Sequence, residues 1–142
     1  MKRRDLLILA GTTGLGLGAQ AQVLDLNDAI NKAGRQRMLS QRMAKFFYAA
    51  TLKVEPAQAQ AEIAKARGEF LSAMELLRNA PEATSPIKDQ LALADNQWLF
   101  FDLALKEING AGPKALSDMF VTSENLLAVM DRITGLYAGL KA

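Results

Sequence analysis

I-N-K-A-G-R-Q-R-M-L-S-Q-R-M-A-K, residues 30–45, has the pattern of one long helix with a single glycine, Gly34, in its interior. Glycine inside a helix costs about 1 kcal/mol relative to alanine. A helix that keeps such a residue usually does so because a second backbone or a ligand approaches closely there. We therefore expect Gly34 to mark a contact point, and the basic residues that follow it to belong to the same surface.

Two stripes run along this helix when successive residues are placed about 100° apart. The polar stripe consists of Ile30, Gly34, Arg37, Gln41, Ala44 and Tyr48. The apolar stripe consists of Leu39, Met43, Phe46 and Ala50. The apolar stripe is typical of a helix that packs into its own bundle. The polar stripe lies roughly opposite, and we expect it to pack against a second copy of the chain.

Three further helices follow the first, which is expected over 24–54 and ends before Pro56. The second begins at Pro56 and stops before Pro81, and Ser85-Pro86 provides a cap and a first-turn proline for the third. Residues 109–113 form the stop before the fourth. The core positions expected in the third helix are Ile87, Leu91, Ala94, Trp98, Phe101, Leu105 and Ile108. Those expected in the fourth are Leu116, Phe120, Ser123, Leu127, Met130, Ile133, Tyr137 and Leu140. Four long helices with short connections predict an all-α fold, an antiparallel up-down-up-down four-helix bundle.

The composition excludes several kinds of chemistry. The chain has 142 residues, no cysteine and no histidine. It therefore lacks thiol nucleophiles, disulfides and the commonest general base, metal ligand and haem ligand. No phosphate-binding loop or paired carboxylate motif is present either. The sequence predicts no metal, no cofactor and no enzymatic activity.

Residues 1–21 have the pattern of an export signal. A basic start is followed by an apolar run from Leu6 to Leu17 and by Ala19-Gln20-Ala21, a small-residue cleavage site. Arg3-Arg4 fits a twin-arginine signal and an ordinary Sec signal equally well. An uncleaved anchor is the alternative to cleavage. The net charge of +2 comes from this segment, so residues 22–142 are neutral and nucleic acid is not an expected partner.

The pattern Ile-Asn-x-Ala-Gly-x-x-Arg-Met-x-Ser-x-Arg over 30–42 resembles the first helix of the PilJ/NarX-type sensor domain. That is the N-terminal periplasmic domain of type IV pili methyl-accepting transducers and of nitrate/nitrite sensor kinases, and the form over 33–42 is more similar to the PilJ branch. Weaker similarity follows at Trp98 and over 123–127. The resemblance implies a four-helix bundle over residues 22–142 that dimerises through its first helix. It also implies an anion at that interface, as in the nitrate-sensing members.

Arg37 is the residue that matches the anion-binding arginine of the resemblance, and Gly34 lies one turn before it. A guanidinium is planar, forked and always charged, which suits a planar oxyanion. Ser40 and Gln41 are placed to add hydrogen bonds. The alternative is that Arg37 lies in a solvated or salt-bridged surface. Residues expected on the surface or in salt bridges are Arg35, Arg42 and Lys45, with Glu124 and Asp131 solvated, whereas Trp98, Phe101 and Tyr137 are expected in the core.

The first functional interpretation is a periplasmic sensor or binding module for a small inorganic anion, nitrate or nitrite, at a homodimer interface. No second apolar segment of about 20 residues follows the signal. Signalling across a membrane would then need a partner, and a membrane signalling protein is the expected one. The second interpretation is a structural or protein-interaction bundle that binds no ligand and acts as the partner of a signalling or export system.

Overall fold

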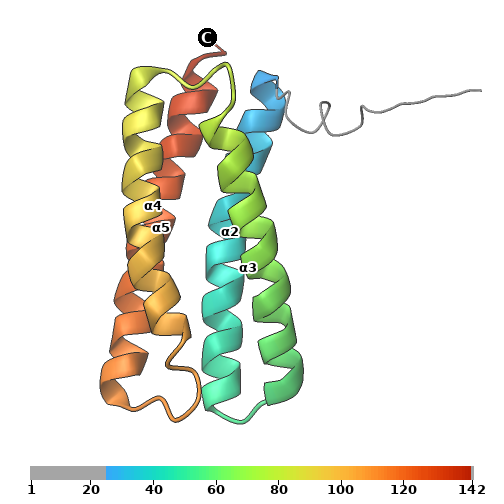
Figure 1. Cartoon of the computed structure of the whole chain (residues 1–142), viewed down its shortest axis with the longest axis vertical. Coiled ribbons are helices and arrows are strands. Elements are labelled where there is room, and N and C mark those ends of the chain that lie inside the picture. Colours follow the sequence, from blue (N-terminus) through green and yellow to red (C-terminus); the bar gives the residue numbers. More distant parts are fainter. Residues whose placement is uncertain (1–24, 142) are drawn as a thin grey trace, which may run out of the picture.

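The structure, a computed structural model, describes residues 25–141 and consists of four antiparallel helices (Figure 1). Helix α2 spans Leu26–Thr51, α3 spans Pro56–Arg78, α4 spans Ser85–Leu105 and α5 spans Pro113–Gly139. Successive helices run in opposite directions, so the predicted up-down-up-down bundle is confirmed. The predicted export signal lies outside the described residues.

Local sequence determines where each helix begins. The Asp25 carboxylate accepts a hydrogen bond from the Asp28 backbone N–H at 2.8 Å, which caps α2. Proline lies in the first turn of the other three helices, where its missing N–H costs nothing. One prediction is shifted by a residue: Thr84, not Ser85, is the N-cap of α4. Gly110, at φ 77°, makes the turn before α5 in a conformation that favours glycine.

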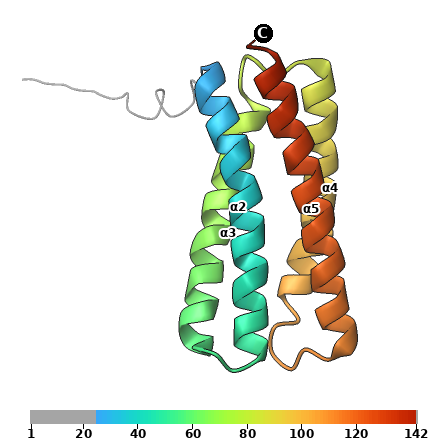
Figure 2. The ribbon, with the colours of Figure 1, turned by 180° about the vertical axis from the view of Figure 1, so that it is seen from behind.

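Helix α2 packs against both α3 and α5, and α4 packs mainly against α5 (Figures 1 and 2). The backbones of α3 and α4 come close to each other at fewer points, and aromatic side chains fill the space between these two helices. Phe70 from α3 stacks on Trp98 from α4 at 4.8 Å between ring centroids, and Phe101 lies beside Trp98 at 5.7 Å. Trp98, Phe101 and Tyr137 are buried as predicted. Burial raises the pKa of the Tyr137 phenol to about 12.

The predicted core positions of α4 are correct within the helix, whereas those of α5 are partly wrong. Leu116, Leu127 and Leu140 are not fully buried, and Phe120 is 63% exposed. The buried residues of α5 are Ala115, Met119, Ser123, Leu126, Val129, Met130, Ile133 and Tyr137. The buried residue is thus one position earlier than predicted at Ala115, Met119 and Leu126, whereas Ser123 is buried as predicted. The spacing could not decide between these neighbours, because both members of each pair are apolar.

The two stripes of α2 also differ from the prediction. The side facing the centre of the bundle carries Ala29, Ala33, Gln36, Ser40, Met43, Phe47 and Ala50, with Leu39 beside them. The polar stripe packs on α5 of the same chain. The Tyr48 hydroxyl donates to the Leu116 carbonyl at 2.6 Å, and Gln41 Nε2 donates to the Ser123 carbonyl at 3.3 Å. The expectation that a second copy covers this whole stripe is therefore corrected, since α5 covers most of it.

Candidate functional site

A shallow groove runs between α2 and α5, the two helices that lie side by side in Figure 2. We call it the α2–α5 groove. Its volume is about 540 Å³, and its lining residues are Arg37, Met38, Gln41, Glu124, Leu127, Ala128 and Asp131. The groove thus contains two of the four predicted ligand residues, Arg37 and Gln41.

Arg37 is held in the groove by an ion pair. Its Nη1 donates to Oδ1 of Asp131 on α5 at 2.7 Å. The side chains of Arg37 and Asp131 are 41% and 65% exposed. Asp131, expected to be solvated, is therefore the partner of the predicted site arginine. Among residues 25–141 no acceptor binds Arg37 Nε or Nη2, so part of the guanidinium fork is available to a ligand.

Gly34 gives the guanidinium a place to lie on the helix. A Cβ atom on Gly34 would meet Arg37 Nη2 at 3.4 Å and Thr134 Cγ2 at 4.0 Å. The expected close approach therefore exists, but what approaches Gly34 is the arginine side chain of its own helix. The Arg37 side chain folds back onto Gly34, where an added Cβ would only touch it, and Asp131 is bound at its other terminal nitrogen.

Ser40 lies away from the groove. Its side chain is fully buried, and its hydroxyl donates to the Arg37 carbonyl at 2.8 Å. Gln41 is half-buried and bridges to α5 through the Ser123 carbonyl. The structure thus brings Gly34, Arg37 and Gln41 to one face and turns Ser40 toward the core.

Gln36 is a buried polar residue that the sequence interpretation missed. It is fully buried, and its Nε2 donates to the Phe70 carbonyl at 2.8 Å. Its Oε1 is buried and accepts no hydrogen bond from residues 25–141. The signal was present in the sequence, because position 36 continues the spacing of Ala29 and Ala33. Gln36 thus joins α2 to α3, whereas the next residue, Arg37, pairs with α5.

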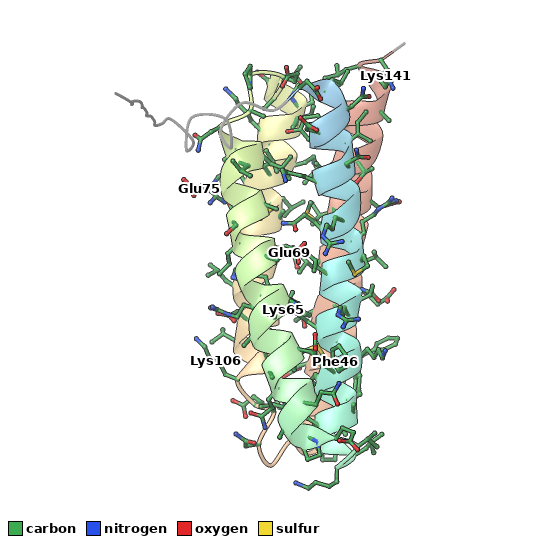
Figure 3. All side chains as sticks on the ribbon, turned by 90° about the vertical axis from the view of Figure 1, so that its right-hand side faces the viewer. Phe46, Lys65, Glu69, Glu75, Lys106 and Lys141 are labelled. Atoms are coloured by element: carbon green, nitrogen blue, oxygen red, sulfur yellow. The ribbon has the colours of Figure 1, made fainter. Side chains whose placement is uncertain are left out.

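Two other basic residues of α2, Arg35 and Arg42, form ion pairs with α3, as predicted. Arg35 pairs with Glu69, which projects from α3 toward α2 (Figure 3). The hydrogen bond from Arg35 lowers the pKa of the Glu69 carboxyl. Arg42 pairs with Glu62 at 3.2 Å, and its guanidinium lies over the Phe46 ring at 4.8 Å. These arginines are neutralised on a different face from Arg37.

A second hollow lies between α4 and α5, near the end of the bundle farthest from Lys141. Its volume is about 1020 Å³, and Phe100, Leu103 and Val121 supply its apolar lining. All three side chains are at least half exposed, as is the neighbouring Leu99. The sequence interpretation did not find this surface, because it followed only the buried side of α4. We call these four residues the α4–α5 apolar surface.

The fold and the groove define a class of protein. The described helices form a bundle with a half-exposed arginine at a helix–helix groove, and residues 25–141 contain no cluster of acidic residues that could hold a metal ion. No helix within these residues is long and apolar enough to cross a membrane. The class that the fold and the groove define is a four-helix bundle with a polar groove between two of its helices.

The chain belongs to the PilJ family, the N-terminal domain of type IV pili methyl-accepting chemotaxis transducers, which it matches over residues 20–117. The match covers α2, α3, α4 and the beginning of α5. This is a family of sensor-type domains and not of catalysts, and it indicates a role with signalling partners. No match was found among curated proteins or among solved structures.

Proposed function

We propose that the chain is an exported, periplasmic sensor module that binds a small oxyanion, nitrate or nitrite, through Arg37 at a homodimer interface that includes α2. The observation that carries this proposal is the state of Arg37. One guanidinium nitrogen is held by Asp131, while the side chain stays 41% exposed in a groove also lined by Gln41. A planar oxyanion can accept hydrogen bonds from the remaining fork.

The charges of the groove limit how a dimeric site can be arranged. One copy places Arg37 beside two acidic residues, Glu124 and Asp131. A single groove therefore carries more negative than positive charge and is a poor anion site. A second copy contributes another Arg37 together with another Glu124 and Asp131, so a dimeric site suits an anion only if the two guanidiniums meet at the interface with the carboxylates outside it. An anion between the two guanidiniums would then relieve their repulsion. The exposed Met38 supplies apolar surface at the same place.

The test is thermal unfolding of residues 22–142 with millimolar nitrate, nitrite, sulfate or chloride. A ligand at 100 times its dissociation constant adds about 2.7 kcal/mol to the free energy of unfolding, several degrees for a domain of this size. We expect nitrate or nitrite to give this shift and to increase the dimer fraction in analytical ultracentrifugation. Arg37→Ala should abolish the shift. Arg35→Ala is the matched control, because Arg35 pairs with Glu69 on another face. Equal behaviour of all four salts would contradict oxyanion recognition.

Export is part of the same proposal and has its own test. The full chain, expressed in a Gram-negative host, should appear in the periplasmic fraction with its N-terminus at Gln22, after Ala21. Replacing Arg3 and Arg4 by lysine should retain the chain in the cytoplasm if the twin-arginine route is used and should leave a Sec signal working. Retention of the uncleaved chain in the membrane would support an anchor instead.

A second candidate function is favoured by the α4–α5 apolar surface. Four large apolar side chains exposed together on two adjacent helices are typical of a protein-binding surface. The fitting occupant is an apolar face of a helix from a chemotaxis transducer, because the family indicates signalling partners. A purified transducer periplasmic segment should then bind the wild-type chain and Arg37→Ala equally, and Leu103→Glu should remove the binding.

A further inference from the structure

Asp131 holds Nη1 of Arg37, one of the two terminal nitrogens, so an anion that binds both terminal nitrogens must displace it. Its Oδ1 accepts from Arg37 Nη1 at 2.7 Å. A carboxylate, like nitrate or nitrite, is a planar group that spreads one negative charge over oxygen atoms, and the guanidinium fork recognises both in the same way. In the unliganded chain α5 thus supplies its own anion to the predicted site.

Asp131 is free to leave this position. Its side chain is 65% exposed, and its bond to Arg37 is its one side-chain hydrogen bond among residues 25–141. An exposed ion pair of this kind is weak, because water solvates both partners well when they separate. Glu124, the other groove acid, has no ion pair within the described part of the chain, and Arg37 remains bound to Asp131 alone.

Other links between α2 and α5 lie on both sides of this pair. Gln41 and Tyr48 donate to carbonyls of α5 on one side, and Lys141 Nζ donates to Asn27 Oδ1 on the other at 2.9 Å. Breaking the Arg37–Asp131 bond would therefore release α5 from α2 only around the groove. The bundle would stay closed at both ends, and the change would be confined to the surface where a second copy is proposed to bind.

We infer that Asp131 is the internal competitor of the oxyanion: it closes the Arg37 site when no ligand is present and is displaced when the anion binds. This inference rests on the proposed function, since it concerns the same arginine. It assigns a regulatory role to α5, because ligand binding exchanges an intramolecular contact between two helices for a contact with the ligand. It also sets the affinity, since every anion must compete with a carboxylate tethered beside the site.

The test is the dissociation constant for nitrate and for nitrite at fixed ionic strength, measured by calorimetry on residues 22–142. Asp131→Asn keeps the shape of the side chain and removes its charge. We expect it to lower the dissociation constant about fivefold, the factor that an exposed ion pair represents. Glu124→Gln is the matched control, because it removes the same charge from the same groove without touching the Arg37 partner. It should change the constant less than twofold.

The outcomes separate the two proposals. If wild type binds, Arg37→Ala does not, and Asp131→Asn binds no better than wild type, the proposed function stands and the competition is wrong. An equal gain in Asp131→Asn and Glu124→Gln would also overturn competition, because it would reflect only the net charge of the groove. If neither wild type nor Asp131→Asn binds nitrate or nitrite, both proposals are wrong. Circular dichroism of each variant confirms that the bundle has folded.

Discussion

Of the three arginine–aspartate pairs that join neighbouring helices within residues 25–141, two differ in nearly every respect except composition. Arg37 and Asp131 share one hydrogen bond across α2 and α5, and both side chains are well exposed. Arg67 and Asp102 share two, at 2.9 and 3.0 Å, across α3 and α4, and Asp102 is only 13% exposed. The Arg67 guanidinium also lies 5.7 Å above the centroid of the Trp98 ring. The same residue types thus make a bidentate, partly buried connection on one side of the bundle and a single exposed ion pair on the other.

The difference follows from the surroundings of each pair. The α3–α4 side has fewer backbone approaches than the α2–α5 side, so side chains must close it. Arg67 covers the edge of the stack formed by Phe70 and Trp98 and is fixed by a bidentate carboxylate. The α2–α5 side is already joined by backbone carbonyls that accept from Gln41 and Tyr48. We therefore expect Arg37 to contribute little to stability there, as the proposed ligand site requires.

The largest effect is expected from removing Trp98, the aromatic residue over which the Arg67 guanidinium lies. Trp98→Ala leaves a cavity next to Phe70 and Phe101 and takes away the surface beneath the guanidinium. We expect a loss of about 3–5 kcal/mol in the free energy of unfolding, measured by urea denaturation. Met38→Ala, a change of an exposed groove residue, should cost less than about 0.5 kcal/mol. A similar loss in both variants would contradict the assignment of the α3–α4 side as the one that aromatic side chains hold together.

The next effect compares the two arginines directly. Arg67→Ala leaves the poorly exposed Asp102 carboxylate with Lys106, 3.8 Å away, as its remaining ion-pair partner. We expect it to cost about 1–2 kcal/mol after allowance for the partial exposure of Arg67. Arg37→Ala should cost less than about 1 kcal/mol, because both partners are well exposed. Denaturation of both variants in parallel decides the comparison, which fails if Arg37→Ala is the more destabilised.

A third effect concerns the glycines beside these arginines. Gly68 follows Arg67, is exposed, and has open space where a Cβ would lie. Gly68→Ala should therefore stabilise α3 by up to about 1 kcal/mol, the full difference in helix propensity. Gly34→Ala should stabilise α2 by a few tenths of a kcal/mol less, because the new methyl group touches Arg37 Nη2 at 3.4 Å. If anion binding uses Arg37, Gly34→Ala should change the nitrate affinity and Gly68→Ala should leave it unchanged. Equal thermal shifts and equal affinities in both variants would show that Gly34 has no role in placing the guanidinium.

Much of this arrangement could be predicted from the sequence. Prolines, caps and glycine-containing turns indicated the helices, and the seam from Ile87 to Leu105 indicated the buried side of α4. The partner of the polar stripe could not be predicted, because spacing shows which residues share a face but not which helix covers it. Asp131 was therefore expected to be solvated, and Gly34 was expected to admit a second backbone or a ligand. The pairing of Arg37 depends on the register between α2 and α5, and this register is set by contacts far apart in the chain.

The smallest effect is a pH dependence that belongs to the Arg67 pair. The hydrogen bond from Arg67 lowers the pKa of Asp102 below its usual value, and Arg35 lowers that of Glu69. A carboxyl whose pKa is lower in the folded chain contributes stability above its unfolded pKa, about 4, and this stability is lost as the pH falls through the folded pKa. Wild type should therefore lose stability below about pH 4. Arg67→Ala should lose less stability over the same range, since of these two carboxyls only Glu69 keeps its arginine.

Arg37→Ala leaves both pairs intact and is the matched control for this titration. Urea denaturation between pH 2.5 and 6 measures how the free energy of unfolding of each of the three proteins depends on pH. A slope for Arg67→Ala as steep as that of wild type would show that the lowered pKa of Asp102 does not depend on Arg67.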